Sequence, residues 1–228
     1  MSTYKELVYM CLDELKSITD DALFTEDHVI FLLGKYRNFI LKQRYSDIKK
    51  QIPESNYQTI CLDLEKVPAI LGEPCTGGYY LRSIQQVPFL MKVATPKVYP
   101  IDYFQGNITY VSRDRLKYVG YNKFLGNIIY TTIGPDHYLY FKSSNPQYLY
   151  LEKINVTGIF EDPVKASELQ CNKKGEDCDI YNKEFPIEAA LVPPLIELVV
   201  KELTVAQYKH EDKNNNAEDD LSEVANSK

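Results

Sequence analysis

The side chains that could carry out catalysis or bind a metal lie far apart along this chain of 228 residues. The histidines are His28, His137 and His210, and none has a cysteine or an acidic residue at the spacing typical of metal ligands. Cys171 and Cys178 flank a hydrophilic stretch with two lysines. We interpret them as free thiols, with a zinc pair or a local disulfide as the alternatives. The sequence therefore predicts no metal and no cofactor.

Sequence motifs of common enzyme classes are missing as well. The chain contains no P-loop, no dinucleotide-binding glycine pattern, no G-x-S-x-G turn and no EF-hand loop. Neighbouring acids such as Glu161 and Asp162 fall in a polar stretch, where solvated carboxylates are the default. We therefore predict that the protein is not an enzyme.

The best candidate for nucleic-acid binding is a short basic patch made by Arg113, Arg115 and Lys117. Three tyrosines are interleaved with it or lie next to it, namely Tyr110, Tyr118 and Tyr121. Arginine beside aromatic side chains is typical of single-strand binding, but the patch also includes Asp114. Three interpretations stay open: a nucleic-acid site, a protein contact surface, and a plain exposed strand and loop.

The composition is that of a globular protein with an acidic balance. Hydrophobic residues make up 44% of the chain, and the formal net charge is −6. Sequence-independent coating of nucleic acid needs a dense basic surface, so this charge argues against it. The chain has 19 Tyr and no Trp, which suits interfaces and half-buried strands. The sequence has neither a signal peptide nor an apolar run of membrane-spanning length, so we expect a soluble protein without a membrane partner.

One long amphipathic helix, predicted over residues 25–50, organises the rest of the chain. Its apolar face at helical spacing consists of Val29, Leu32, Leu33, Tyr36, Phe39 and Ile40. Arg37 and Arg44 flank this face, where their stems can cover its edge. A basic stripe recurs every seven residues away from the face, at Lys35, Lys42 and Lys49. The stripe is either a solvated surface or a docking surface for an acidic partner.

A shorter helix is predicted ahead of it, over residues 4–17. Thr3 and Glu6 have the spacing of a capping box. Two helices joined by so short a link are expected to be antiparallel neighbours.

Strand patterns replace helical ones from about residue 57 to residue 160. Short runs rich in Tyr, Ile, Val and Thr alternate with Pro and Gly, which predicts a mostly antiparallel sheet. We predict a hairpin between residues 138–142 and 148–153, with its turn at Asn145-Pro146. In this hairpin, leucine and phenylalanine would face one side and tyrosine the other.

The last part of the chain returns to helical patterns. A short helix is predicted over residues 163–170, and a longer one from Pro194 to about Lys209, since proline suits a first helical turn. Glu202 falls within the apolar arc of the longer helix. It pairs with an Arg or Lys of the same or a neighbouring subunit, or it reaches solvent.

These segments predict an α+β protein in which a helical bundle from the N- and C-terminal segments carries an inserted, Tyr-rich, mostly antiparallel β domain. We assign residues 1–55 to the first helices, 56–160 to the β domain and 161–209 to a loop and the last helix. Residues 210–228 are acidic and form a disordered tail or a docking arm.

Several long strings in the chain resemble a conserved structural protein family of crAss-like phages. The strings include KYRNFILKQRYSDIKK, RLKYVGYNKFLGNIIY, IGPDHYLYFKSSNPQYLYLEK and EFPIEAALVPPLIELVVKEL. The resemblance implies a virion ring protein at the head–tail connector beneath the portal, assembled in the bacterial host. It implies a homo-oligomeric, twelve-fold ring that contacts the portal protein and other tail or ring proteins, with DNA only as passing cargo.

No catalytic residues come with this resemblance. We therefore expect contacts between subunits or with the portal at the lysine stripe, at Arg113, Arg115 and Lys117, and at Glu202. The alternative from a different class is a virion-surface or tail-tip module that binds host glycans, because tyrosine rings can stack on sugars.

Overall fold

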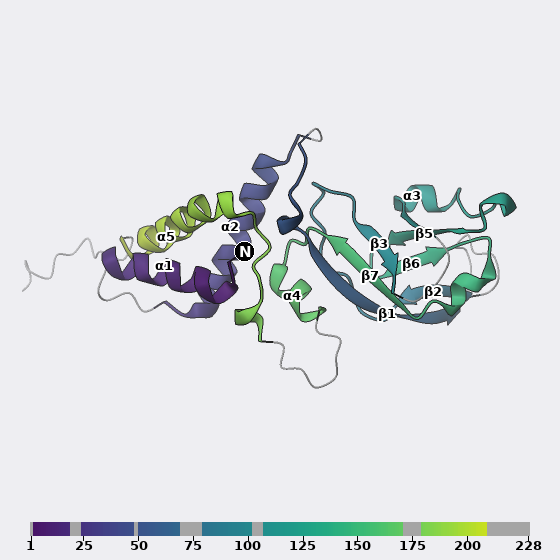
Figure 1. Ribbon diagram of the computed structural model, residues 1–228, viewed down its shortest axis with the longest axis horizontal. Coiled ribbons are helices and arrows are strands. Elements are labelled where there is room, and N and C mark those ends of the chain that lie inside the picture. The colour runs from purple at the N-terminus through teal and green to yellow at the C-terminus, as the bar shows by residue number, and fades with distance from the viewer. Residues whose placement is uncertain are drawn as a thin grey trace, which may run out of the picture.

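The computed structural model describes residues 2–18, 24–47, 50–68, 79–101, 107–170 and 179–208. Figure 1 shows an elongated molecule with the long helices at one end and a β-sheet at the other. The prediction of an α+β fold is thus confirmed. No helix within the described ranges is both long and apolar enough to cross a membrane.

The three longer helices pack against one another. They are α1 (Tyr4–Ile18), α2 (Glu26–Arg44) and α5 (Val192–Tyr208). The capping box at the start of α1 is confirmed, since Thr3 N donates to Glu6 Oε2 at 2.9 Å and Glu6 N donates to Thr3 Oγ1 at 3.2 Å. Both prolines of α5 lie in its first turn, where no intrahelical partner is lost. Leucine and valine side chains of all three helices share one apolar core.

Helix α2 differs from its prediction in length and in orientation. It ends at Arg44, and the Lys50 ammonium donates back to the Arg44 carbonyl at 3.1 Å instead of continuing the helix. Phe39, predicted in the core, is 57% exposed, whereas Arg37, predicted at the edge, is fully buried. The buried face is therefore shifted toward Arg37 and Leu41.

The shift of α2 follows from the hydrogen bonds of Arg37. Its guanidinium donates to the backbone carbonyls of Pro186 at 2.6 Å, Phe160 at 2.9 Å and Asn56 at 3.1 Å. These carbonyls belong to the segments that lead to α5, leave the sheet and enter the sheet. Burial lowers the pKa of Arg37 to about 10, so the side chain is still charged at neutral pH. One side chain thus ties the helices to the sheet.

The sheet has seven strands in the order β3-β7-β1-β2-β6-β5-β4. Their bounds are β1 Gln58–Pro68, β2 Tyr79–Ser83, β3 Lys97–Pro100, β4 Asn107–Tyr110, β5 Ile128–Ile133, β6 Leu139–Lys142 and β7 Lys153–Gly158. Neighbouring strands are antiparallel except β4 and β5, which confirms the mostly antiparallel sheet. The sheet curls so that β3 and β4 come into contact, and it encloses a second apolar core.

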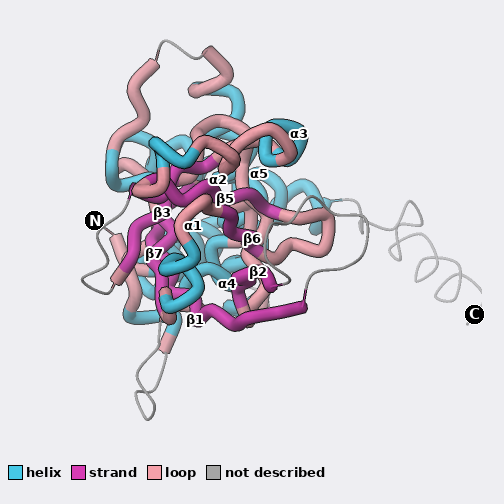
Figure 2. Tube along the Cα trace, turned by 90° about the vertical axis from the view of Figure 1, so that its right-hand side faces the viewer, coloured by secondary structure: helices cyan, strands magenta, loops and turns pink. Residues whose placement is uncertain are grey.

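Short helical segments connect these elements. The α-helical ones are α3 (Arg113–Leu116) and α4 (Pro163–Glu168), the second of which was predicted. The 3-10 turns are η1 Glu54–Asn56, η2 Lys123–Leu125, η3 Pro146–Tyr150, η4 Ile180–Asn182 and η5 Ala189–Leu191. Seen along the long axis in Figure 2, α3 lies above the sheet and β1 is its lowest strand.

The predicted hairpin between residues 138–142 and 148–153 is wrong. Asn145 accepts a hydrogen bond from the Gln147 N–H at 3.0 Å, and residues 146–150 form η3 in place of a strand. Strand β7 instead pairs with β1 and β3. The predicted faces hold in β6, where Leu139 and Phe141 are fully buried, but fail in η3, where Tyr148 is 5% exposed and Tyr150 is 76% exposed.

Cys11 gives the helical core a predictable dependence on pH. Burial raises the pKa of this thiol from 9.0 to about 12. Below pH 9.0 the thiol is protonated in both the folded and the unfolded state. Between pH 9.0 and 12 the thiol ionises only in the unfolded state. The contribution of buried Cys11 to the free energy of unfolding is therefore lost as the pH rises. We expect the stability gap between wild type and Cys11→Ala, measured by urea unfolding, to narrow by about 2 kcal/mol from pH 7 to pH 10.5. A gap that does not change would contradict this prediction.

Candidate assembly surfaces

Helix α2 presents an outer face that combines aromatic and basic side chains. Phe31 is 65% exposed and Phe39 57% exposed, with Lys35 between them and Lys42 nearby. Lys35 Nζ lies 3.6 Å from Glu202 Oε1 of α5, and both side chains are about half exposed. Glu202 therefore pairs within its own subunit at the surface and is not in the core. Lys49, the third member of the predicted stripe, lies outside the described residues.

A second exposed surface is the loop that runs from β4 to β5, here called the excursion (residues 111–127). Its aromatic side chains extend into solvent to an unusual degree, with Tyr118 and Phe124 both 83% exposed and Tyr121 56% exposed. The basic patch predicted from the sequence lies in and next to α3 in the same loop, and all three of its members, Arg113, Arg115 and Lys117, are exposed. Aromatic and arginine side chains together are enriched at protein interfaces.

Lys142 of β6 holds the excursion onto the sheet. Its side chain is only 3% exposed, and its ammonium donates to the Leu116 carbonyl at 3.3 Å and lies 4.0 Å from the centre of the Tyr121 ring. Gly120 has a φ of 83°, and a Cβ at this position would approach Lys142 Cγ to 3.2 Å. The lysine stem thus packs against a residue whose positive φ is a backbone conformation that only glycine adopts easily.

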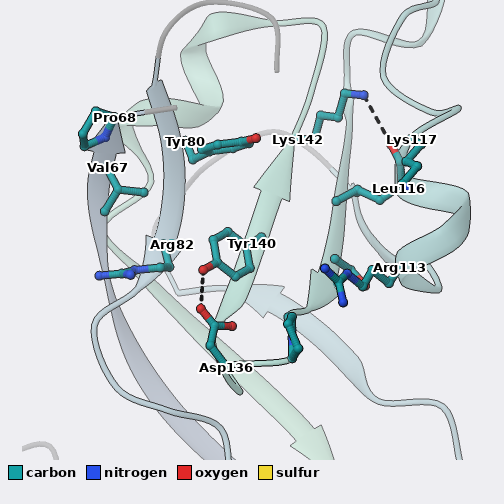
Figure 3. A pocket seen from close by; sticks show the side chains of 13 residues that line it. Val67, Pro68, Tyr80, Arg82, Arg113, Leu116, Lys117, Asp136, Tyr140 and Lys142 are labelled. Atoms are coloured by element: carbon teal, nitrogen blue, oxygen red, sulfur yellow. Dashed lines mark hydrogen bonds between the residues drawn. The ribbon is translucent and has the colours of Figure 1, made fainter. Parts of the chain in front are cut away.

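A pocket of about 480 Å³ opens between the excursion and the sheet. Figure 3 shows Arg113, Leu116 and Lys117 along one side and Tyr80 and Arg82 along the other.

Hydrogen bonds and ion pairs occupy several polar groups in this pocket. The Tyr140 hydroxyl donates to Asp136, and burial, followed by this hydrogen bond, raises the pKa of Tyr140. Arg82 forms an ion pair with Glu65. Two further cations of the pocket, Arg113 and Lys117, suit a carboxylate or another anion. Within the described ranges, no set of three potential metal-ligating side chains gathers.

A groove of about 620 Å³ lies between α2 and α4. Its apolar lining includes Ile30, Phe31 and Val164, and its acidic side chains include Asp27, Glu161 and Glu168. Two lysines also line the groove, and the partners of Lys35 and Lys165 are Glu202 and Asp162, not these three acids. The groove therefore combines an apolar floor with more acidic than basic side chains.

The predicted site residues fall into two separate groups. Lys35, Lys42 and Glu202 lie at the helical end, whereas Arg113, Arg115 and Lys117 lie at the far end of the sheet (Figure 1). Sequence reasoning named Tyr118 and Tyr121 beside the basic patch, but it missed the exposed Phe124 of the same loop and the exposed Phe31 of α2. The string KFL could have indicated Phe124. Its phenylalanine and leucine lie between two turn-forming stretches and belong to no strand that would bury them.

Two exposed surfaces that combine aromatic and basic side chains are typical of a subunit built for contacts with other macromolecules. The chain belongs to the family described as phage tail ring protein 2, whose model matches residues 6–221. It is 64% identical, over 223 residues, to Ring protein 2 of Bacteroides phage crAss001, which covers 97% of this chain and 99% of that protein. The resemblance to a crAss-like phage family is therefore confirmed.

Proposed function

We propose that this protein is a structural subunit of a closed ring at the head–tail connector, beneath the portal. The ring joins the portal to the tail and encloses the channel through which DNA passes. The observation that carries this proposal is the pairing of a ring-protein family with two separate exposed surfaces on one subunit. A closed ring needs two different contact surfaces on every subunit. We take the ring to be twelve-fold, with the portal protein and other tail or ring proteins as partners.

The proposed parts of the subunit are a helical bundle, a β domain and a docking arm. The helices from residues 1–55 and 161–209 form the bundle, and residues 56–160 form the β domain. Residues 210–228, beyond α5, are the proposed docking arm. The acidic balance of the chain suits a DNA conduit, because tight contacts between cations and phosphates would slow the passage of DNA.

Within this proposal, the outer face of α2 is a contact with the next subunit or with the portal. Exposed lysines next to exposed phenylalanines give such a contact both charge selectivity and an apolar area to bury. Lys49 belongs to the same proposed contact by sequence spacing, and Glu202 positions Lys35 through their ion pair.

Reversing the charges of Lys35 and Lys42 to Glu is expected to weaken assembly while the subunit stays folded. Both side chains are exposed, so we expect the free energy of unfolding to change by no more than about 1 kcal/mol. Particle mass in solution, alone and with the portal, measures the loss of assembly. The matched control reverses Lys5 and Lys16, which are exposed on α1. Equal assembly by both variants would contradict the role of this face.

A second candidate function is that of a tail-tip module that binds host glycans, and the tyrosine-lined pocket is the place to test it. Tyr80 and Tyr140 are in contact edge to face, with ring centroids 6.2 Å apart. This arrangement does not present the flat stacked platform that suits a sugar ring. Binding of the purified protein to host-surface glycans, lost on Tyr140→Ala, would favour this second function over the ring.

A further inference from the structure

We infer that the excursion of one subunit inserts into the groove between α2 and α4 of a second copy. This inference rests on the proposed ring function and identifies the contact that closes the ring.

The excursion has the chemistry of an inserted element. It places Tyr118 and Phe124 at its surface with most of their area in solvent, next to the exposed cations Arg113 and Arg115. Isolated exposed apolar residues are ordinary, but several aromatic side chains on one short loop form a contact surface. No ion pair within the described part of the chain neutralises either arginine.

The groove has the complementary chemistry. Its apolar floor includes Phe31, which is 65% exposed, and its volume of about 620 Å³ has room for aromatic side chains. Glu161 and Glu168 are exposed at its α4 side. Cationic, aromatic side chains on one surface therefore meet acidic, apolar ones on the other, an arrangement that steers association and fixes its register.

A second copy is the occupant that the geometry favours. Lys142 holds each excursion to its own sheet, and Figure 1 places α3 over the sheet near β5 and α4 between the sheet and the long helices. An excursion therefore cannot fill the groove of its own subunit. Because the two surfaces differ and lie apart, their contact is head-to-tail, which is the kind of interface that generates a ring.

A charge exchange tests this contact in the full-length protein. One variant carries Arg113→Glu and Arg115→Glu, and the other carries Glu161→Arg and Glu168→Arg. We expect each variant alone to weaken self-association about tenfold or more, and all four changes in one chain to recover most of the loss. Sedimentation velocity measures the association, and circular dichroism verifies that every variant is folded. The control variant, Lys92→Glu with Lys97→Glu, changes two exposed lysines elsewhere.

Mixing the two variants gives a sharper readout. Each variant retains one intact surface, and the two reversed surfaces are complementary to each other, so the mixture is expected to recover association through alternating copies of the two variants, which neither variant forms alone. Wild-type rings with no recovery in the exchanged chain would overturn this contact while leaving the ring function in place. The contact is also overturned if the variants still form rings and lose only the binding of another virion protein. A wild-type chain that stays monomeric even with the portal would overturn the ring function itself.

Discussion

Replacing Arg37 with Met is expected to lower the free energy of unfolding by about 3–5 kcal/mol. The guanidinium is fully buried and donates to three backbone carbonyls from three separate segments. Met fills much of the volume but donates no hydrogen bond, so all three carbonyls would lose this donor away from water. Buried polar groups without partners are among the costliest defects in a folded protein.

Urea unfolding of wild type and Arg37→Met measures this loss directly. Arg37→Lys is expected to fall between the two, because one ammonium cannot reproduce the planar fork of a guanidinium. The matched control is Arg44→Met on the same helix, where the arginine is 46% exposed and paired with Glu188. We expect that control to cost no more than about 1 kcal/mol. Similar losses at both positions would show that Arg37 does not join the helices to the sheet as described.

Replacing Lys142 with Met is expected to free the excursion from the sheet and to abolish assembly. The variant loses the hydrogen bond to the Leu116 carbonyl and the contact with the Tyr121 ring, which together we expect to be worth about 1–3 kcal/mol locally. The thioether still packs on Gly120, so the sheet core is expected to stay intact. A loosened excursion must be ordered again on binding, and that entropy weakens the contact.

Limited trypsin digestion reports the release of the excursion, because Arg113, Arg115 and Lys117 are all cleavage sites within it. We expect cleavage there to become at least about tenfold faster in Lys142→Met, since cleavage follows local opening. The control is Lys153→Met, whose lysine is about half exposed on β7. Unchanged cleavage together with normal assembly would rule out this role for Lys142.

The features that could be predicted from the sequence are those set by local chemistry. The capping box at Thr3 and Glu6, Pro194 in the first turn of α5 and the helix after Asp162 all form as predicted, although α5 begins two residues earlier, at Val192. In each case the determining contacts lie within a few residues. The mostly antiparallel sheet could also be predicted, from the composition of the short β-type runs and from the Pro and Gly residues between them.

Long-range contacts explain the features that the sequence did not reveal. Arg37 looked like a helix-edge residue because its three carbonyl partners are up to 149 positions away. The predicted hairpin was wrong because we paired β7 with the strand nearest to it in the sequence. In the structure, β7 pairs with β1 and β3 instead. The candidate site divided in the same way: the basic residues were identified, but not the exposed Phe31 and Phe124 beside them. Which hydrophobic side chains remain uncovered depends on the whole fold.

An electron-microscopy reconstruction of the particle neck tests the central proposal most directly. We predict a closed ring of this chain beneath the portal, with the α2 face and the excursion both buried in contacts and an open axial channel. A reconstruction that places the chain at a tail tip or fibre, or that leaves both surfaces in solvent, would contradict it.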